Sequence, residues 1–490
     1  MGTARRIAKN AAVTFFGDNL LKVLSTVLVI LIARYLGDVD YGKFTFALSF
    51  TGLFLVLMDL GTRILIVRDI IQNKDKAPKI VANVLLLKVV STTVVYFLML
   101  AIAYFLSYDH NTMVALAIAG AGLIFDSLAA TVGSIFQAYE RLEFGVMARI
   151  TRILLRFAVT VPLLLMGVSF IWILVIYAVV HFINFVMVLA ICYKKFVALN
   201  FDFDKNMIVS ILKRSFPFWL SGIFVTVYFR IDITLMSKLA PTALAGVYSA
   251  VSRDAVIGWY SSAYNLLDAA AAIAGAVSAA ILPVAVAYFR DSREKLMKLY
   301  SLAARYLVFI AVPTAVGTTL LADKIIVLLY KAEYANASLA LQILIWTMVP
   351  LCINYMMGAM MIASHQEKKG VYVLMLNAVV NILLNLYLIP RYSLYGAAVA
   401  TVLTEIFYFA GYYFIISRSV GHLDFVKMFV KPVVASAVMG LVIFKFMGGL
   451  PVVVAIIASM IIYGAAMFLM KALEEEDIAL IRKIFIRKEI

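Results

Sequence analysis

The sequence predicts an all-α integral membrane protein with about 14 transmembrane helices. Of its 490 residues, 65% are hydrophobic and only 14% are charged. Soluble domains are nearer to half apolar and a quarter charged. The apolar residues gather in runs of about 20, the length that a helix needs to cross the hydrocarbon layer of a bilayer. We therefore expect one integrated membrane body rather than a series of soluble domains.

The apolar runs follow one another with short polar turns between them. The first follows a short basic segment, and its length favours a retained helix over a cleaved signal peptide. The predicted spans lie at about 11–36, 43–67, 80–107, 112–137, 150–167, 170–193, 212–238, 260–288, 301–321, 338–363, 370–389, 394–417, 428–447 and 450–470. The longest candidate loops are 194–211 and 239–259, so no large external domain is expected.

The net charge of +16 is unevenly distributed along the chain. Lysines and arginines concentrate in every second turn and at both ends, whereas the intervening turns hold few. Membrane proteins keep their basic turns in the cytoplasm, and only an even number of helices preserves this alternation. The pattern predicts a multi-pass protein of the cell membrane with both termini cytoplasmic. It also explains the basic charge without nucleic acid, which is not expected as a partner.

Two pairs of segments suggest an internal repeat. Residues 133–145 and 358–370 both run from glycine to glycine over the same distance, across a short charged turn. A second match aligns Leu36 and Gly42-KFTFA with Leu239 and Gly246-VYSAV. Together these matches predict that helices 1–6 recur as helices 7–12 with the same orientation. Parallel repeats of this kind are a transporter architecture with a substrate path between the halves.

The repeat predicts the domain organisation. Two six-helix lobes are joined by a cytoplasmic linker and followed by two additional helices. The tail alternates apolar and basic residues, which favours an interfacial amphipathic helix over a solvated tail. The predicted segments are 1–195 (helices 1–6), 196–211 (linker), 212–420 (helices 7–12), 421–470 (helices 13 and 14) and 471–490 (tail).

Motifs for catalysis are absent from the sequence. It contains neither the GxxxxGK[ST] phosphate loop nor a GxSxG nucleophile motif. The four histidines are far apart, and the two cysteines are isolated within apolar runs, so neither a metal site nor a disulfide is indicated. We expect a protein that is not an enzyme and needs no cofactor. Coupling to H⁺ or Na⁺ stays open.

Several stretches resemble a known family. They are ARYLGDVDYGKF at 33–44, LMDLGTRILIVRD at 57–69, FRIDITLMSKL at 229–239, AGVYSA at 245–250 and NAVVNILLNLYLIPRYSLYGAAVATVLTE at 377–405. With the repeat and the helix count, the chain resembles the Wzx-like polysaccharide flippases of the MOP superfamily. The resemblance covers nearly the whole chain and departs at 251–260. It implies two six-helix lobes plus two helices, and it matches Asp232 to the acidic residue of the family's helix-7 motif.

Basic residues within the spans are the first candidates for a binding site. Hydrocarbon tolerates such charges only where they face protein or water. Arg149, Arg152 and Arg156 recur every three to four residues, and a stripe of guanidinium groups suits a phosphate or pyrophosphate. Anchoring at the interface by snorkelling is the alternative, and it also applies to Lys88. The predicted cationic cavity contains Lys22, Arg63, Arg152, Arg156, Arg230 and Arg253.

Acidic residues within the spans are candidates for ion coupling or gating. Asp18 precedes Lys22 by four residues, and Asp59 precedes Arg63 by four, so each pair shares a helix face. Either pair lines a cavity mouth or only neutralises itself and fixes helix packing. For each carboxylate, a structural hydrogen bond is the competing interpretation. The candidates are Asp18, Asp59, Asp126, Asp232, Asp268 and Glu405.

The excess of basic side chains within the spans favours an anionic cargo. We therefore expect an alternating-access flippase that moves a lipid-linked oligosaccharide, carried on polyprenyl phosphate or pyrophosphate, to the outer leaflet for surface polysaccharide assembly or protein glycosylation. Expected partners are that lipid, membrane lipids and the glycosyltransferases, polymerase or ligase of the same pathway. The alternatives are a cation-coupled multidrug exporter, a peptidoglycan-precursor flippase and, in a different class, a membrane glycan polymerase or ligase.

Overall fold

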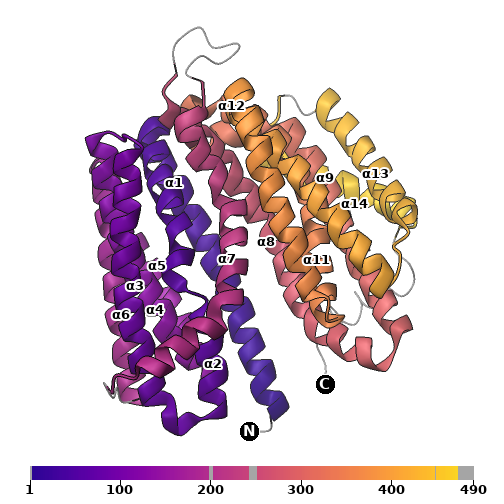
Figure 1. Ribbon diagram of the computed structural model, residues 1–490. Helices are drawn as coiled ribbons and strands as arrows, with labels where there is room; N and C mark the ends of the chain where they lie inside the picture. Colours follow the sequence, from indigo (N-terminus) through magenta and orange to yellow (C-terminus); the bar gives the residue numbers. More distant parts are fainter. Residues whose placement is uncertain (1–2, 198–201, 242–250, 447–448, 473–490) are drawn as a thin grey trace. The chain divides into compact units, whose positions relative to one another are not determined.

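The computed structural model describes residues 3–197, 202–241, 251–446 and 449–472, with side chains from residue 16 onward. Every regular element in this part of the chain is helical (Figure 1). The elements are α1 (Thr3–Asp59), α2 (Thr62–Gln72), η1 (Lys74–Lys76), α3 (Ala77–Phe105), α4 (His110–Ala138), α5 (Leu142–Leu165), α6 (Phe170–Lys195), α7 (Lys205–Leu239), α8 (Arg253–Asp291), α9 (Arg293–Tyr330), η2 (Ala332–Tyr334), α10 (Ala337–Leu344), η3 (Ile345–Thr347), α11 (Met348–Ala363), α12 (Glu367–Ser419), α13 (Phe425–Phe446) and α14 (Val452–Leu469).

The helices account for all fourteen predicted spans. Eleven helical stretches in the described residues are long and apolar enough to cross a membrane. Two of them hold two spans each, because α1 is interrupted at Gly37 and α12 at Ser393. The 24-residue helix α5 adds the last span. Gly37 has φ 78°, a conformation that glycine adopts without steric cost.

The second predicted span differs from the structure at its end. The sequence predicts one helix over 43–67, but α1 ends at Asp59 and α2 begins at Thr62. Leu60 and Gly61 between them have φ values of 51° and 64°, which no right-handed helix allows. A Cβ atom at position 61 would lie 2.6 Å from the backbone nitrogen of Trp219 in α7. The helix is therefore interrupted where α7 approaches it closely, and the apolar periodicity of the sequence does not indicate this interruption.

The predicted external loop 239–259 is also shorter than expected. Helix α8 begins at Arg253, because the Ser252 hydroxyl accepts the Ala255 N–H and caps its first turn. The backbones of α1 and α8 approach closely here. A Cβ atom on Gly42 would overlap the Asp254 carbonyl oxygen, so only glycine fits at this crossing.

The structure confirms the repeat that joins 133–145 to 358–370. Helix α4 ends at Ala138 and α11 at Ala363, and α5 begins at Leu142 and α12 at Glu367. Each boundary is displaced by 225 positions. The turns share their conformation as well: Glu140 has φ 57° and its counterpart His365 has φ 55°. The two turns are therefore copies of one backbone structure built from different residues.

The chain forms two compact units. Unit 1 comprises residues 1–265 and 374–400, and unit 2 comprises 266–373 and 401–490. In unit 1, side chains from α2 to α7 form a buried apolar cluster that includes Leu65, Val132 and Cys192. In unit 2, α9, α13 and α14 pack through Leu321, Met439, Ile443 and Ala455. The division into lobes of 1–195 and 212–420 stays a prediction.

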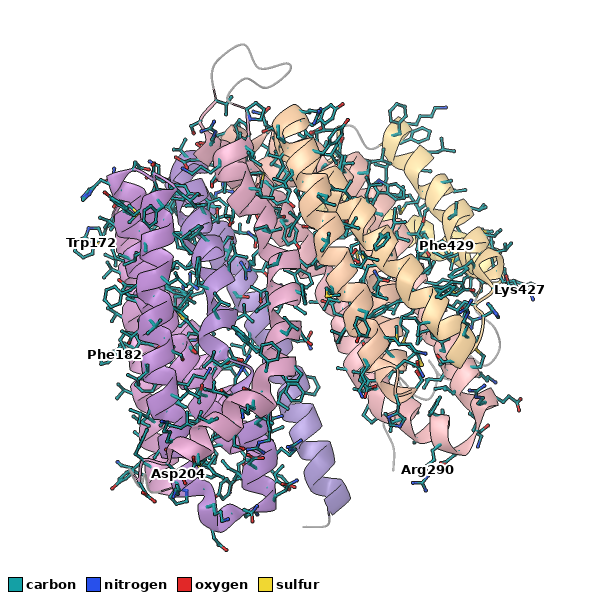
Figure 2. All side chains as sticks on the ribbon, in the orientation of Figure 1. Trp172, Phe182, Asp204, Arg290, Lys427 and Phe429 are labelled. Atoms are coloured by element: carbon teal, nitrogen blue, oxygen red, sulfur yellow. The ribbon has the colours of Figure 1, made fainter. Side chains whose placement is uncertain are left out.

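The outer surfaces of the helices are apolar. Trp172 and Phe182 of α6 project from the helix with 59% and 47% of their surface exposed, whereas Asp204, Arg290 and Lys427 lie beyond or at helix ends (Figure 2). Exposed aromatic and aliphatic side chains along whole helices suit contact with lipid. The chain is a multi-pass membrane protein. The AGVYSA stretch at 245–250, its repeat match at 246 and nearly all of the predicted amphipathic tail lie outside the described residues.

Candidate functional site

A cavity of about 700 Å³ lies within unit 1. Its walls come from the end of α1 and from α2, α4, α5, α6 and α7. The charged side chains that line it are Asp59, Arg63, Asp126, Arg149 and Arg152. Within a membrane bundle, charges of this kind face partners or water. The cavity therefore brings together four residues that the sequence proposed for binding or coupling, and it places Arg149 beside them.

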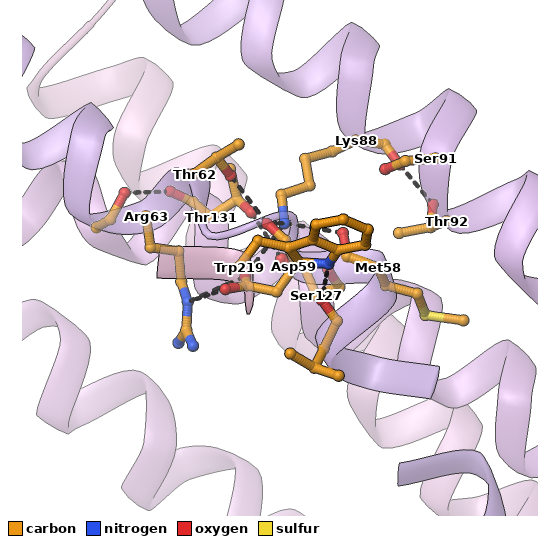
Figure 3. Close-up of polar contacts among 12 residues, drawn as sticks. Met58, Asp59, Thr62, Arg63, Lys88, Ser91, Thr92, Ser127, Thr131 and Trp219 are labelled. Carbon is orange, nitrogen blue, oxygen red and sulfur yellow. Dashed lines mark hydrogen bonds and ion pairs between the residues drawn. The ribbon is translucent and has the colours of Figure 1, made fainter. Parts of the chain in front are cut away.

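The Asp59 carboxylate lies between two basic side chains (Figure 3). Arg63 Nε is 3.1 Å from Asp59 Oδ1, as the four-residue spacing predicts. Lys88 Nζ is also 3.1 Å from this oxygen, and it donates to the Met58 and Asp59 carbonyls as well. Lys88 is completely buried, so it does not snorkel to the interface. It closes the C-terminal end of α1 by satisfying carbonyls that have no helical partner.

Local contacts fix this turn from the other side. The Thr62 hydroxyl donates to the Asp59 carbonyl at 3.1 Å. Trp219 Nε1 of α7 donates to the Val56 carbonyl at 3.0 Å. Asp59 and Arg63 therefore extend from a turn that α3 and α7 both hold. Arg63 keeps 54% of its side chain exposed, so its guanidinium group stays accessible within the cavity.

A second ion pair joins α4 and α5 across the cavity. Arg152 Nη1 donates to Asp126 Oδ1. The Nε2 atom of His181, on α6, lies 3.7 Å from the same oxygen. His181 is only 5% exposed, and its Nδ1 lies 2.7 Å from the Tyr177 carbonyl oxygen. One carboxylate oxygen thus faces both a guanidinium and an imidazole group.

Arg149 has a carboxylate partner as well. Its Nη2 lies 2.6 Å from Asp18 Oδ1 of α1. The two side chains are 42% and 54% exposed, and ion pairs this accessible to solvent contribute little to stability. All three cavity arginines are therefore paired with aspartates in this state. An incoming anion would have to replace carboxylates rather than occupy unpaired guanidinium groups.

Arg156 differs from its neighbours on the same stripe. Its guanidinium carbon lies 5.1 Å from the ring centre of Tyr177, a cation–π contact. Its Nε is buried, with no hydrogen-bond partner among the described residues. The cavity lining includes Arg149 and Arg152 but not Arg156. The three arginines thus share a helix face without sharing surroundings.

Neutral polar groups complete the cavity. Ser134, Gln137 and Asn184 line it, and Gly133 leaves open space where a side chain would project. Asn184 is 5% exposed, and its Oδ1 accepts no hydrogen bond from the described residues. A buried amide oxygen without a donor favours a ligand or water that can supply one. Hydroxyl groups of a sugar have this capacity.

Other predicted cations have different surroundings. Arg230 of α7 is exposed beside Gly52 of α1, with Nε 3.9 Å from where a Cβ of that glycine would lie. Lys22 is half-buried on α1 and does not contribute to the cavity lining. Arg253 Nε donates to the Ala240 carbonyl at 2.9 Å and thereby joins the start of α8 to the end of α7.

Asp232 is buried in unit 1, with 5% of its surface exposed. It accepts a hydrogen bond from the Tyr260 hydroxyl and another from the Ile233 N–H. Asp232 therefore has structural hydrogen bonds, which was the alternative to a role in ion coupling.

The two remaining carboxylates belong to unit 2. Glu405 is 2% exposed, and its Oε2 accepts the Asn354 amide at 2.6 Å. Asp268 of α8 is exposed. Glu405 is therefore held between α11 and α12, whereas Asp268 is accessible.

Comparison with known sequences identifies the family. A sequence model of the family described as "Polysaccharide biosynthesis protein" matches residues 7–289, more than half of the chain. The chain belongs to this family. It shares 24% identity over 246 residues with the lipid II flippase MurJ of Bacillus subtilis, covering 49% of this chain and 44% of that protein. It shares 23% identity over 163 residues with the probable low-salt glycan biosynthesis flippase Agl15 of Haloferax volcanii, covering 33% of this chain and 34% of that protein. The chain thus spans less than half the length of either relative.

Solved structures agree with the family assignment at the level of fold. A lipid II flippase MurJ in an inward closed conformation superposes with a TM-score of 0.76 at 16% identity, covering 94% of this chain and 98% of the other. An inward-facing multidrug resistance MATE family transporter of the MOP superfamily gives a TM-score of 0.65 at 17% identity, covering 82% and 94%. This polysaccharide biosynthesis protein therefore has the MOP-superfamily fold, as the sequence resemblance implied.

Two residues escaped the sequence interpretation: Asn184, which lines the cavity, and His181, which lies beside the lining residue Asp126. His181 was considered only as an isolated histidine, and Asn184 not at all. Tyr177, His181 and Asn184 recur at spacings of four and three, which puts them on one face of α6. A polar stripe in an otherwise apolar span was the available indication. No group of three metal-binding side chains occurs among the described residues.

Proposed function

We propose that the protein is an alternating-access flippase for a lipid-linked oligosaccharide. It would move a glycan on polyprenyl phosphate or pyrophosphate from the cytoplasmic to the outer leaflet, for surface polysaccharide assembly or protein glycosylation. Membership of the polysaccharide biosynthesis family and similarity to two flippases support this proposal. The observation that carries it is the cavity lined by Arg63, Arg149 and Arg152 inside a membrane bundle.

The chemistry of such a cargo matches that cavity. Its phosphates are anionic, and planar guanidinium groups bind phosphate oxygens through paired hydrogen bonds. In surroundings of low dielectric constant, this attraction is several times stronger than in water. The sugar would meet Gln137 and Asn184 next to the arginines. A polar headgroup could thus leave water while its lipid tail stayed in hydrocarbon.

The orientation follows from the basic turns. Lys79, Arg141 and Lys195 lie at the ends of helices in unit 1, and the positive-inside rule assigns such turns to the cytoplasm. We propose that both termini lie there and that the cavity receives its cargo from that side. The pathway enzymes that make or use the glycan are the proposed partners.

A lipid II type of precursor is the second candidate cargo. The match to the Bacillus subtilis flippase favours it, and its pyrophosphate group would suit the same arginines. A multidrug exporter is disfavoured because cationic drugs require a mainly acidic cavity, whereas this one has more guanidinium groups than carboxylates.

Reconstitution tests both the activity and the cargo. Vesicles containing the purified protein would receive a fluorescent undecaprenyl-pyrophosphoryl oligosaccharide or lipid II, and headgroup exposure in each leaflet would be followed over time. The Asp126→Asn/Arg152→Gln variant removes one ion pair without leaving an unpaired charge. We expect it to lose at least about tenfold in flipping rate, because one charge-assisted anion contact is worth about 1.5–3 kcal/mol.

Arg290→Ala provides the matched control. Arg290 is 91% exposed at the end of α8, in unit 2, so its loss should leave flipping intact. Normal flipping by the Asp126→Asn/Arg152→Gln variant would exclude the cavity as the cargo site. Movement of lipid II but not of the oligosaccharide would select the second candidate.

A further inference from the structure

The hydrogen bond at His181 Nδ1 determines which ring nitrogen can take a proton. Nδ1 lies 2.7 Å from the Tyr177 carbonyl oxygen. A carbonyl oxygen only accepts hydrogen bonds, so Nδ1 must carry the hydrogen that is donated to it. In the neutral ring, Nε2 is then the nitrogen with a free lone pair. Any proton that His181 binds is therefore bound at Nε2.

A proton on Nε2 would change the interaction of His181 with Asp126. It lies 3.7 Å from Asp126 Oδ1, beyond hydrogen-bond distance. In the neutral state, a lone pair faces a carboxylate oxygen, and nothing draws the two atoms together. With a proton on Nε2, the imidazolium N–H faces the Asp126 carboxylate and can donate to it. A small side-chain movement then brings Nε2 and Oδ1 within hydrogen-bond distance.

Asp126 Oδ1 is already engaged by Arg152 Nη1. His181 and Arg152 therefore approach the same oxygen from different helices, α6 and α5. Asp126 and Arg152 line the cavity, with side chains 26% and 27% exposed, so water and solutes can reach the pair. An anion that binds Arg152 would weaken its hold on Asp126.

The electrostatic surroundings of His181 combine one carboxylate with several cations. The charged and titratable groups facing the ring or its neighbour Tyr177 are Asp126 on α4, Arg152 and Arg156 on α5, Tyr177 on α6 and Arg230 on α7. Asp126 is the group that favours an imidazolium, and the arginines oppose it. A change in which cation Asp126 neutralises thus decides whether His181 can hold a proton.

We propose that His181 is a proton-binding site linked to anion binding at Arg152, with Asp126 exchanged between the two. When an anionic headgroup takes the Arg152 guanidinium, His181 Nε2 takes a proton from cavity water and Asp126 Oδ1 accepts it as a hydrogen bond. Protonation of His181 in turn releases Arg152 for the anion. The inference rests on the proposed function only in identifying the anion as a phosphate-bearing headgroup.

The linkage is reciprocal and can be measured from either side. If protonation increases the affinity for the anion by a certain factor, anion binding increases the affinity for the proton by the same factor. For sites that share one ion partner, we expect a factor of about ten, within the usual range for coupled sites.

Histidine NMR on the purified protein in detergent tests the proton side. The chain contains only four histidines, and His181→Gln identifies the His181 resonance by its loss. The probe anion is sulfate, whose charge is fixed across the working range, so that any pH dependence belongs to the protein. We expect the midpoint of the His181 titration to move about one pH unit upward on saturation with sulfate.

Sulfate binding at one pH below both His181 midpoints and at one pH above both tests the anion side. Wild-type protein should bind about ten times more tightly at the lower pH. His181→Gln should bind equally at both values, and His110→Gln, at an exposed position at the start of α4, should keep the wild-type difference. Asp126→Asn should also abolish the difference, because both cations lose their shared partner.

Two results would overturn the proposal. Sulfate that binds wild-type protein without moving the His181 resonance, and with equal affinity at both pH values, would refute the linkage and leave the proposed function intact. Failure of sulfate to bind at either pH would remove the anion site itself, and with it both the linkage and the cavity assignment. If His181→Gln does not fold, single replacements of His110, His365 and His422 identify the His181 resonance by elimination, and the wild-type titration still decides the question.

Discussion

Replacement of Lys88 by methionine should destabilise the protein strongly. The change keeps the volume of the side chain and removes an ammonium group that is completely buried and donates to Met58 O, Asp59 O and Asp59 Oδ1. Loss of one member of a buried ion pair costs about 3–5 kcal/mol. Asp59 keeps Arg63 and 18% exposure of its side chain, so we expect about 3 kcal/mol, near the lower limit.

A double-mutant cycle separates the ion pair from the packing. Asp59→Asn in the Lys88→Met background removes the carboxylate that has lost its buried partner, so part of the lost stability should return. We expect a coupling free energy of about 1–2 kcal/mol between the two positions. Unfolding in mixed detergent micelles measures both quantities, with tryptophan fluorescence as the reporter; one of the tryptophans, Trp219, donates to Val56 O beside this turn. A Lys88→Met variant within about 0.5 kcal/mol of wild type would refute the reasoning.

Three further predictions concern other parts of the chain. Gly42→Ala should cost about 2 kcal/mol in the same unfolding measurement, because its Cβ would overlap the Asp254 carbonyl oxygen; an unchanged stability would contradict the close crossing. Glu405→Gln keeps side-chain volume and a carbonyl acceptor but removes the ionisable group, so flipping should lose its dependence on an imposed pH gradient; retained dependence would exclude this carboxylate from coupling. A backbone N–H of α7 and then the Lys79 ammonium hold the pKa of Asp204 below its ordinary value. The ionised Asp204 therefore stabilises the folded state fully above the unfolded pKa of about 3.9, and this stabilisation is lost as the pH falls through the lower folded pKa. Asp204→Asn should make the free energy of unfolding fall less steeply with decreasing pH in this acidic range. An unchanged pH dependence would contradict this.

The sequence predicted the features that depend on neighbouring residues. Apolar runs located the fourteen spans, and the glycines at 133, 145, 358 and 370 revealed the repeat that the helix boundaries reproduce. The Asp59–Arg63 pair followed from a spacing of four residues. These features share one property: they are set within a single helix or by the comparison of two segments.

Such patterns could not predict which side chains of different helices contact one another. Asp18 pairs with Arg149 across 131 positions, and Asp126 pairs with Arg152 across 26. No periodicity states which face of one helix meets which face of another. The sequence therefore identified the charges but not their partners, and it suggested an excess of unpaired cations where the structure has ion pairs. The break at Gly61 was missed for the same reason, because it is shaped by α7.

The repeat also relates two polar contacts that the sequence treated separately. In unit 1, Asp126 of α4 faces His181 of α6. In unit 2, Asn354 of α11 binds Glu405 of α12. A displacement of 225 positions carries 126 to 351 and 181 to 406, within one helical turn of the second pair. Each unit thus holds a polar contact between helices at positions that this displacement nearly superimposes.

The pairing of every cavity arginine with an aspartate has a consequence for the unloaded protein. A carrier that works as proposed must return to the cytoplasmic side without cargo after each delivery. Bare guanidinium groups would make that return step costly, because unpaired ions lose their hydration in a low-dielectric passage. In the proposed cycle, the aspartates act as internal counterions while the cavity is empty, and the phosphates of the proposed cargo replace them during export. Removal of Asp18 or Asp126 should therefore slow the reset of the transport cycle more than the loading of cargo.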